Sequence, residues 1–138
     1  MNKKIIAAIF GVVITISILV IIQSTFNTSD QIILEQTFMI SAVYFENTGY
    51  AEISFFDKSS KTKHVALEIL GMPESFHKEY MSSTFVEKIP IPVPKYGWQS
   101  IPVVLLVEHE EFGNIGIKTE IRPVGEIPSK VIFSKLDV

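Results

Sequence analysis

Residues 101–122 read IPVVLLVEHEEFGNIGIKTEIR and carry the clearest structural pattern in the 138-residue chain. From residue 115 to residue 122, isoleucine or threonine alternates with glycine or a charged residue, which is the period of a strand with one buried face. Residues 101–109 are apolar at nearly every position, which is typical of a central strand. Gly113 lies in the polar turn between these segments, so the stretch predicts two neighbouring strands.

The same organisation extends outward over the rest of the chain after about residue 31. Short segments rich in Ile, Val, Phe, Tyr and Thr are separated by turn residues such as those in Asn47-Thr48-Gly49. We expect strands at residues 32–45, 50–56, 64–70, 85–93, 101–109, 115–122 and 130–136. Residues 74–84 lack strand alternation and predict a short helical turn or a long crossover loop.

Residues 89–94 read IPIPVP, with proline at every second position. Proline has no backbone N–H to donate, so it is confined to sheet edges and to extended connections. The run therefore predicts an edge strand or a polyproline-like connection. We favour the edge strand, in which the prolines prevent pairing with another chain.

About seven strands in one domain are typical of an immunoglobulin-like β-sandwich. Residues 96–121, YGWQSIPVVLLVEHEEFGNIGIKTEI, resemble the end of immunoglobulin-like and fibronectin-like domains in membrane-anchored surface proteins of prokaryotes, including archaea. The resemblance covers about a quarter of the domain, and the cysteine pair and strand tryptophan of antibody domains are missing. It implies an all-β architecture and leaves function open.

Residues 5–22 read IIAAIFGVVITISILVII and contain no charged residue. As a helix rising about 1.5 Å per residue they would extend roughly 27 Å, close to the bilayer's hydrocarbon thickness of about 30 Å. Lys3 and Lys4 precede the segment, so the positive-inside rule places the N-terminus in the cytoplasm. The sequence therefore predicts a single-pass protein of the cell membrane, with a cytoplasmic stub at 1–4, a transmembrane signal anchor at 5–22, a tether at 23–30 and an extracytoplasmic domain at 31–138.

A cleaved signal peptide is the alternative for this segment, because it has the same order of a basic and an apolar region. Signal-peptide apolar regions usually span about 7–15 residues, and this one is longer. Residues 23–26 also lack a cleavage site of the A-x-A kind. With or without cleavage, residues 31–138 are expected outside the cytoplasm.

Composition excludes several classes of protein. The chain has no cysteine, which rules out disulfides, thiolate zinc sites and cysteine nucleophiles. A net charge of −3 argues against a nucleic-acid partner. No G-x-S-x-G, S-x-x-K or glycine-rich phosphate loop occurs, so we predict neither an enzyme nor a cofactor.

Two groups of residues are candidate sites. His109, Glu110 and Glu111 carry imidazole and carboxylate groups that could bind copper or zinc, although neighbouring strand residues point in opposite directions and a solvated hairpin end is preferred. Tyr96, Trp98 and Phe112 are aromatic residues in or beside turns, where they could contact a partner. For Trp98 we prefer the alternative that it covers one open end of the sandwich.

The sequence thus predicts an anchored binding or assembly module that contacts an envelope protein or a subunit of a membrane complex. The alternative is an extracytoplasmic metal-handling domain built around His109. Neither the identity of the partner nor the oligomeric state follows from the sequence.

Overall fold

The structure is a computed structural model that describes residues 27–92 and 94–136. It is all-β, as predicted, apart from one helix at the start. The elements are α2 (Thr28–Thr37), β1 (Phe38–Phe45), β2 (Tyr50–Asp57), β3 (Thr62–Ile69), β4 (Phe76–Tyr80), β5 (Thr84–Pro90), β6 (Ile101–His109), β7 (Gly113–Pro123) and β8 (Ile132–Lys135). Within the described residues no helix has the length and apolar character needed to cross a membrane. The predicted span at residues 5–22 lies outside them.

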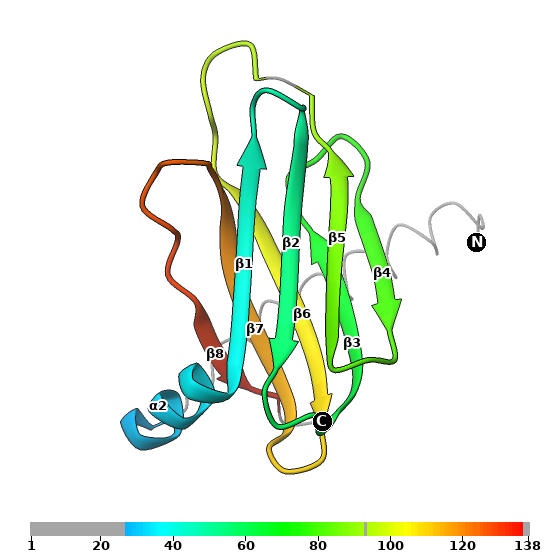
Figure 1. The fold of residues 1–138 in the computed structure, drawn as a ribbon, viewed down its shortest axis with the longest axis vertical. Coiled ribbons are helices and arrows are strands. Elements are labelled where there is room, and N and C mark those ends of the chain that lie inside the picture. Colours follow the sequence, from blue (N-terminus) through cyan, green and yellow to red (C-terminus); the bar gives the residue numbers. More distant parts are fainter. Residues whose placement is uncertain (1–26, 93, 137–138) are drawn as a thin grey trace, which may run out of the picture.

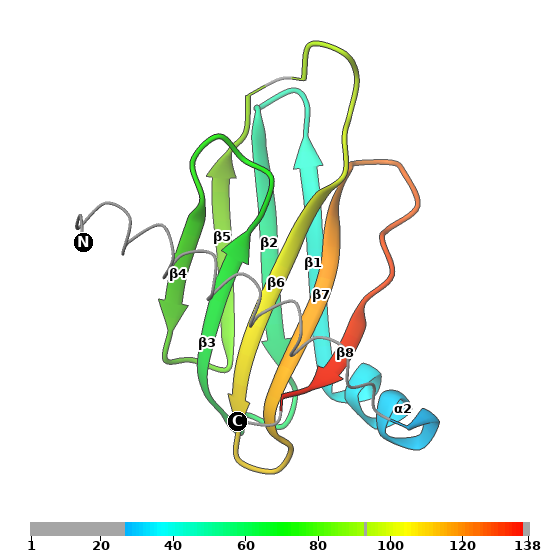
Figure 2. The same ribbon diagram turned by 180° about the vertical axis from the view of Figure 1, so that it is seen from behind.

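The strands form one eight-stranded sheet in the order β4-β3-β6-β7-β1-β2-β5, with β8 paired to β7. The pairing of β1 with β7 is parallel and covers only Val43 with Arg122 and Tyr44 with Pro123. The sheet curls there, so that β1, β2 and β5 lie in front of β3, β6 and β7 (Figures 1 and 2). The result is a nearly barrel-like arrangement with strands on both sides of one core.

The core fills the space between the two halves of the sheet. Phe38 on β1 packs against Phe55 on β2 and also against Phe133 on β8, with ring centroids 5.8 Å and 6.2 Å apart. The largest fully buried side chains come from both halves and from the helix: Tyr44, Phe55, Phe133, Leu34, Ile53, Leu67, Ile69, Leu105, Ile115, Ile117, Ile121 and Val65. The alternating isoleucines that mark residues 115–121 are therefore core residues.

The pair of strands predicted from residues 101–122 is confirmed. β6 and β7 pair in antiparallel register from Ile101 with Ile121 to His109 with Gly113. Gly113 has a φ of 74°, which a residue with a side chain rarely adopts. Both edges of β6 are paired, with β3 and with β7, so β6 is a central strand.

The predicted strand at residues 32–45 is wrong in its first part, because α2 continues to Thr37 and β1 begins at Phe38. The side chain of Asn27 caps the helix by accepting a hydrogen bond from Asp30 N at 3.0 Å. Leu34 is the buried residue of α2, and this single contact with the core gave no apolar periodicity to detect. The helix also begins inside the segment predicted as a tether at 23–30.

The prediction for residues 74–84 is also wrong, since Phe76–Tyr80 forms the strand β4. This strand pairs with β3 alone, and its three central side chains are exposed. A strand with so little burial has no alternating pattern.

The edge-strand prediction for the proline run is confirmed at Pro90, the last residue of β5. β5 ends the order of strands and pairs only with β2. Ile91 N donates to Gly49 O at 2.9 Å, so the odd-numbered residues of β5 bond to β2 and the nitrogen of Pro90 faces the outer side. Residue 93 lies outside the described residues.

Candidate functional site: a crevice beside strand β1

The structure does not bring the three predicted aromatic contacts together. Tyr96 is 94% exposed in the connection between β5 and β6. Trp98 precedes β6, stacks on Tyr44 with centroids 4.6 Å apart, and donates its indole N–H to Ile121 O at 3.1 Å. Phe112 follows β6 and packs on the ring of His109 at 4.7 Å. Trp98 and Phe112 therefore lie at opposite ends of β6 and both pack against the core.

His109 has no ring nitrogen available for a metal ion. Its Nδ1 accepts hydrogen bonds from the backbone N–H groups of Glu111 at 3.1 Å and Phe112 at 3.2 Å. The ring proton therefore lies on Nε2, which is 3.0 Å from Ser59 Oγ and 3.3 Å from Asp57 Oδ2. Within residues 27–92 and 94–136 no three metal-ligating side chains converge.

The glutamates beside His109 do not share its environment. Glu111 is exposed and pairs with Lys61 at 3.0 Å, and Glu110 is exposed as well. The structure therefore does not assemble the candidate metal site of His109, Glu110 and Glu111.

Sequence reasoning missed the buried carboxylate of Asp57, which organises the connection between β2 and β3. Its oxygens accept hydrogen bonds from the backbone and hydroxyl of Ser59 at 2.8 and 2.6 Å, from the backbone and hydroxyl of Thr62 at 2.9 and 2.7 Å, and from Lys61 N at 3.0 Å. Burial alone would raise the pKa of Asp57, but these hydrogen bonds outweigh it and hold the pKa below its usual range. The sequence DKSSKT, an aspartate followed by hydroxyl residues, was the available signal for such a turn.

Asp57, Ser59 and His109 form a structural cluster and not a catalytic triad. In a triad the serine and the aspartate bond to different nitrogens of the histidine. Here both lie against Nε2, and the nitrogen that would otherwise act as a base is occupied by backbone N–H groups. His109 therefore cannot take the proton of Ser59, and the cluster joins two turns.

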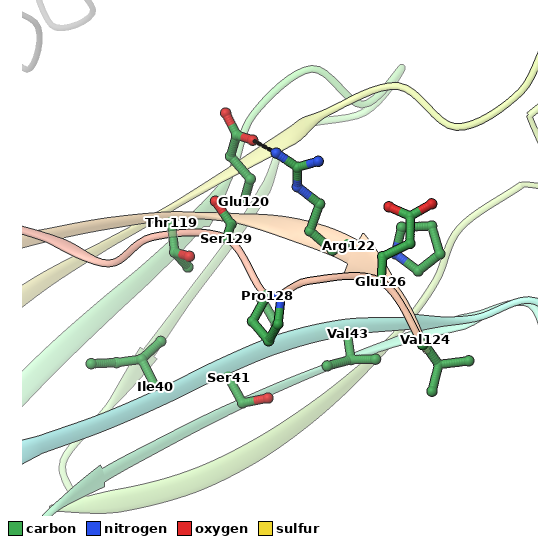
Figure 3. A pocket seen from close by; sticks show the side chains of 13 residues that line it. Ile40, Ser41, Val43, Thr119, Glu120, Arg122, Val124, Glu126, Pro128 and Ser129 are labelled. Carbon is green, nitrogen blue, oxygen red and sulfur yellow. Dashed lines mark hydrogen bonds and ion pairs between the residues drawn. The ribbon is translucent and has the colours of Figure 1, made fainter.

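A crevice of about 320 Å³ opens between β1 and the connection from β7 to β8. Figure 3 shows Ile40, Ser41 and Val43 of β1 along one side and Arg122 with the following connection along the other. A second hollow of about 370 Å³ shares Ile40 and continues toward Phe38 and Val131. The two hollows follow β1 along the side that faces away from β2.

Arg122 lines this crevice from the end of β7. Its guanidinium lies 3.3 Å from Glu120, and Glu126 also lines the hollow (Figure 3). Arg122 Nε is shielded from solvent and has no hydrogen-bond acceptor among the described residues. A buried donor without an acceptor is costly, and such a group commonly marks a place for a water or a ligand.

β4 and β5, the first and last strands in the order of the sheet, contact each other through side chains. The rings of Tyr80 and Phe85 stack with centroids 3.8 Å apart, and Lys78 bonds to Glu87 at 2.9 Å. Tyr80 donates its hydroxyl to the same carboxylate. Burial and this hydrogen bond raise the pKa of Tyr80, whereas the bonds from Tyr80 and Lys78 outweigh burial and lower the pKa of Glu87.

Comparisons with protein-family models, with curated proteins and with solved structures found no match to the chain. What the described residues define is therefore a small all-β domain with an open crevice along one strand.

Proposed function

We propose that this protein is anchored in the cell membrane by a single helix and presents an immunoglobulin-like β-domain outside the cytoplasm. That domain binds an envelope protein or a subunit of a membrane complex. The observation that carries the proposal is the charge-free apolar stretch of residues 5–22 directly after Lys3 and Lys4.

The surface of α2 supports a position near a membrane. Leu34 packs into the core, whereas Ile32 and Ile33 are 51% and 47% exposed. The helix begins at Thr28, six residues after the apolar stretch ends. Isoleucines exposed so close to a membrane-spanning segment could contact the bilayer surface.

The arrangement of the strands supports the immunoglobulin-like class. Two sets of strands pack face to face over one core, and six of the seven pairings in the described sheet are antiparallel. The parallel pairing of β1 with β7 joins the first strand of one set to a late strand of the other. This all-β arrangement is a scaffold that commonly serves recognition.

A binding role suits the described polar groups better than a chemical one. The Asp57 cluster is engaged in holding turns, whereas the crevice beside β1 is lined by backbone groups of β1 and by Arg122. These are recognition features, because they offer hydrogen bonds and apolar contact.

The topology of the full chain in membranes tests the proposal. We expect residues 31–138 to resist protease added from the cytoplasmic side, and we expect Lys3→Glu with Lys4→Glu to weaken that orientation. The matched control is Lys58→Glu with Lys63→Glu, which changes the same charge on exposed residues of the domain. Cleavage of the wild-type domain from the cytoplasmic side would refute the proposed location.

Crosslinking in intact membranes followed by mass spectrometry tests the binding role. We expect a reproducible membrane or envelope protein attached to residues 31–138. Recovery of self-products alone, or of no product, would contradict a binding module.

A further inference from the structure

We propose that the crevice beside β1 binds an extended peptide segment of the partner protein, which adds to β1 as a further strand. The inference rests on the proposed binding function and specifies the chemistry of the partner. It rests on two observations. Alternate backbone groups of β1 face the crevice, and the other strand edges carry protecting groups that this edge lacks.

Alternate backbone groups of β1 point into the crevice. Lys58 N donates to Thr37 O at 3.0 Å, so the odd-numbered residues from Met39 onward bond to β2. Val124 N donates to Tyr44 O at 2.9 Å, so the even-numbered residues face the other way.

Two of these four even-numbered residues, Phe38 and Ile40, have no hydrogen-bonded strand beside them on this side. The ladder with β7 covers Val43 and Tyr44 and extends no further. In the described part of the chain, both backbone groups of Ile40 and the N–H of Ala42 therefore face the crevice unpaired by any strand. Donors and acceptors at this spacing fit an extended peptide.

The other open edges of the sheet carry a proline, an ion pair or a side-chain hydrogen bond, whereas β1 has the crevice and the connection from β7 to β8 beside it. The outer edge of β5 carries Pro90 and faces β4 across the Lys78–Glu87 ion pair. The Phe133 carbonyl of β8 accepts a hydrogen bond from the side chain of Gln31 at 3.1 Å. Proteins usually protect an edge with proline, charge or a covering segment. Residues 38–42 read FMISA and contain neither proline nor charge.

The crevice also has room, about 320 Å³, and few backbone hydrogen bonds hold the segment on its far side. Residues 124–128, along one side of it, are exposed, and the backbone N–H groups of Val124 and Glu126 donate to Tyr44 O and Pro123 O. Ile40 and Ala42 offer apolar contact on the core side of β1, and Ser41 and Val43 lie on the outer side. We therefore expect a peptide with alternating apolar residues.

The charges around Arg122 restrict which peptide residue can lie beside it. Arg122 lines the crevice and its guanidinium lies 3.3 Å from Glu120, so a neutral peptide carbonyl or side-chain amide suits the position beside it. Glu120 and Glu126 line the same crevice, so a carboxylate at this position would be repelled. The preferred peptide is therefore neutral where it passes Arg122.

The test is selection from a phage-displayed library of random peptides against the full chain in detergent micelles. We expect enriched peptides with alternating apolar residues and few acidic ones. Their binding should slow amide hydrogen exchange at Ile40 and Ala42 in the wild-type chain, measured at single-residue resolution. In the free chain these two amides should exchange faster than those of Met39 and Ser41, which bond to β2.

Ala42→Pro removes one crevice-facing N–H and should weaken peptide binding by about tenfold or more. The matched control is Val86→Pro, which removes an outward N–H from the edge of β5 and should leave binding unchanged. The exchange measurement needs no variant, so misfolding of Ala42→Pro would not remove the test. Failure to enrich any peptide, protection confined to β5, or a second copy of the chain in the crevice would overturn the inference.

The two proposals fail separately. A domain that is outside the membrane but binds no peptide refutes the crevice and leaves the anchored module. A domain that binds peptide at β1 but lies in the cytoplasm refutes the location and leaves the crevice.

Discussion

The carboxylate of Asp57 lies 3.3 Å from Nε2 of His109, and both side chains are completely buried. Asp57 ends β2 and His109 ends β6, so the contact ties the β2–β3 connection to the β6–β7 hairpin. Phe38 covers the ring of His109 edge-on with centroids 5.4 Å apart. One end of the curled sheet is therefore closed by a hydrogen-bonded network beneath aromatic rings.

Asp57→Asn should destabilise the domain by about 3 kcal/mol, measured by urea unfolding. The new amide would point donor groups at Lys61 N or Thr62 N, which are donors themselves. Glu74→Gln makes the same chemical change at an exposed position and should alter the unfolding free energy by less than about 0.5 kcal/mol. Equal stability of the two variants would show that the network contributes little.

Acid should remove the contribution of Asp57 to the stability of the folded domain. The pKa of this carboxyl is lower in the folded chain than its ordinary value of 3.8, so the stabilisation is complete above that value and is lost as the pH falls through the folded pKa. The stability difference between the wild type and Asp57→Asn should be constant from neutral pH to about pH 5 and shrink below pH 4. Urea unfolding at several pH values measures it, and a difference that grows with acid would contradict the direction of the shift.

The network was hard to predict because its members are far apart in sequence. Asp57 and His109 meet only after β3 has paired with β6, and the sequence does not define which strands are neighbours. The glutamates around His109 predict a solvated hairpin end, yet its ring is buried while Glu110 and Glu111 are exposed. Charge patterns report the solvated side of a turn and not the side that packs.

Tyr80→Phe should lower the free energy of unfolding by about 1 kcal/mol, because Glu87 loses a hydrogen-bond donor in a shielded position between β4 and β5. Alkaline absorbance titration provides a second measurement. Tyr80 should ionise at a higher pH than an ordinary tyrosine, and the difference between the wild type and Tyr80→Phe isolates its signal. Glu87→Gln should lower the pKa of Tyr80, because it removes the carboxylate that disfavours the phenolate. An unchanged titration in Glu87→Gln would disprove the contact.

Trp98→Ala should cost about 3 kcal/mol of unfolding free energy, since it removes the stack on Tyr44 and the hydrogen bond to Ile121 O. Tyr96→Ala is the natural control, because that side chain is 94% exposed. It should leave stability within about 0.5 kcal/mol. If Trp98→Ala were as stable as Tyr96→Ala, Trp98 would not be a structural residue.

The strands that were predicted well are those with a strong burial pattern. β6 and β7 have clear apolar or alternating sequences because both lie over the core. β4 was missed because its exposed residues form a strand only through pairing with β3. The sequence of α2 predicts a strand because Ile32 and Ile33 suggest burial, whereas both are about half exposed. The crevice was not predictable, since it arises where β1 and β7 diverge after two paired residues.

The proline run should act as a block on edge pairing. In β5 the even-numbered residues present their backbone to the outer side, so Pro90 stands where an N–H would otherwise be available to another chain. Replacing Pro90, Pro92 and Pro94 with threonine restores donors and favours extended backbone. We expect the variant to stay folded and to self-associate.

Light scattering on the purified triple variant measures this change, with Pro73→Thr as the control in the exposed connection between β3 and β4. The control should have the mass of the wild type, while the triple variant should show a larger species whose population increases with protein concentration. Peptide binding at β1 should be unchanged in both, because the crevice lies on the opposite edge of the β1–β2–β5 half of the sheet. If the triple variant has the mass of the wild type while its partner binding falls, the run is a docking segment and its edge-blocking role is wrong.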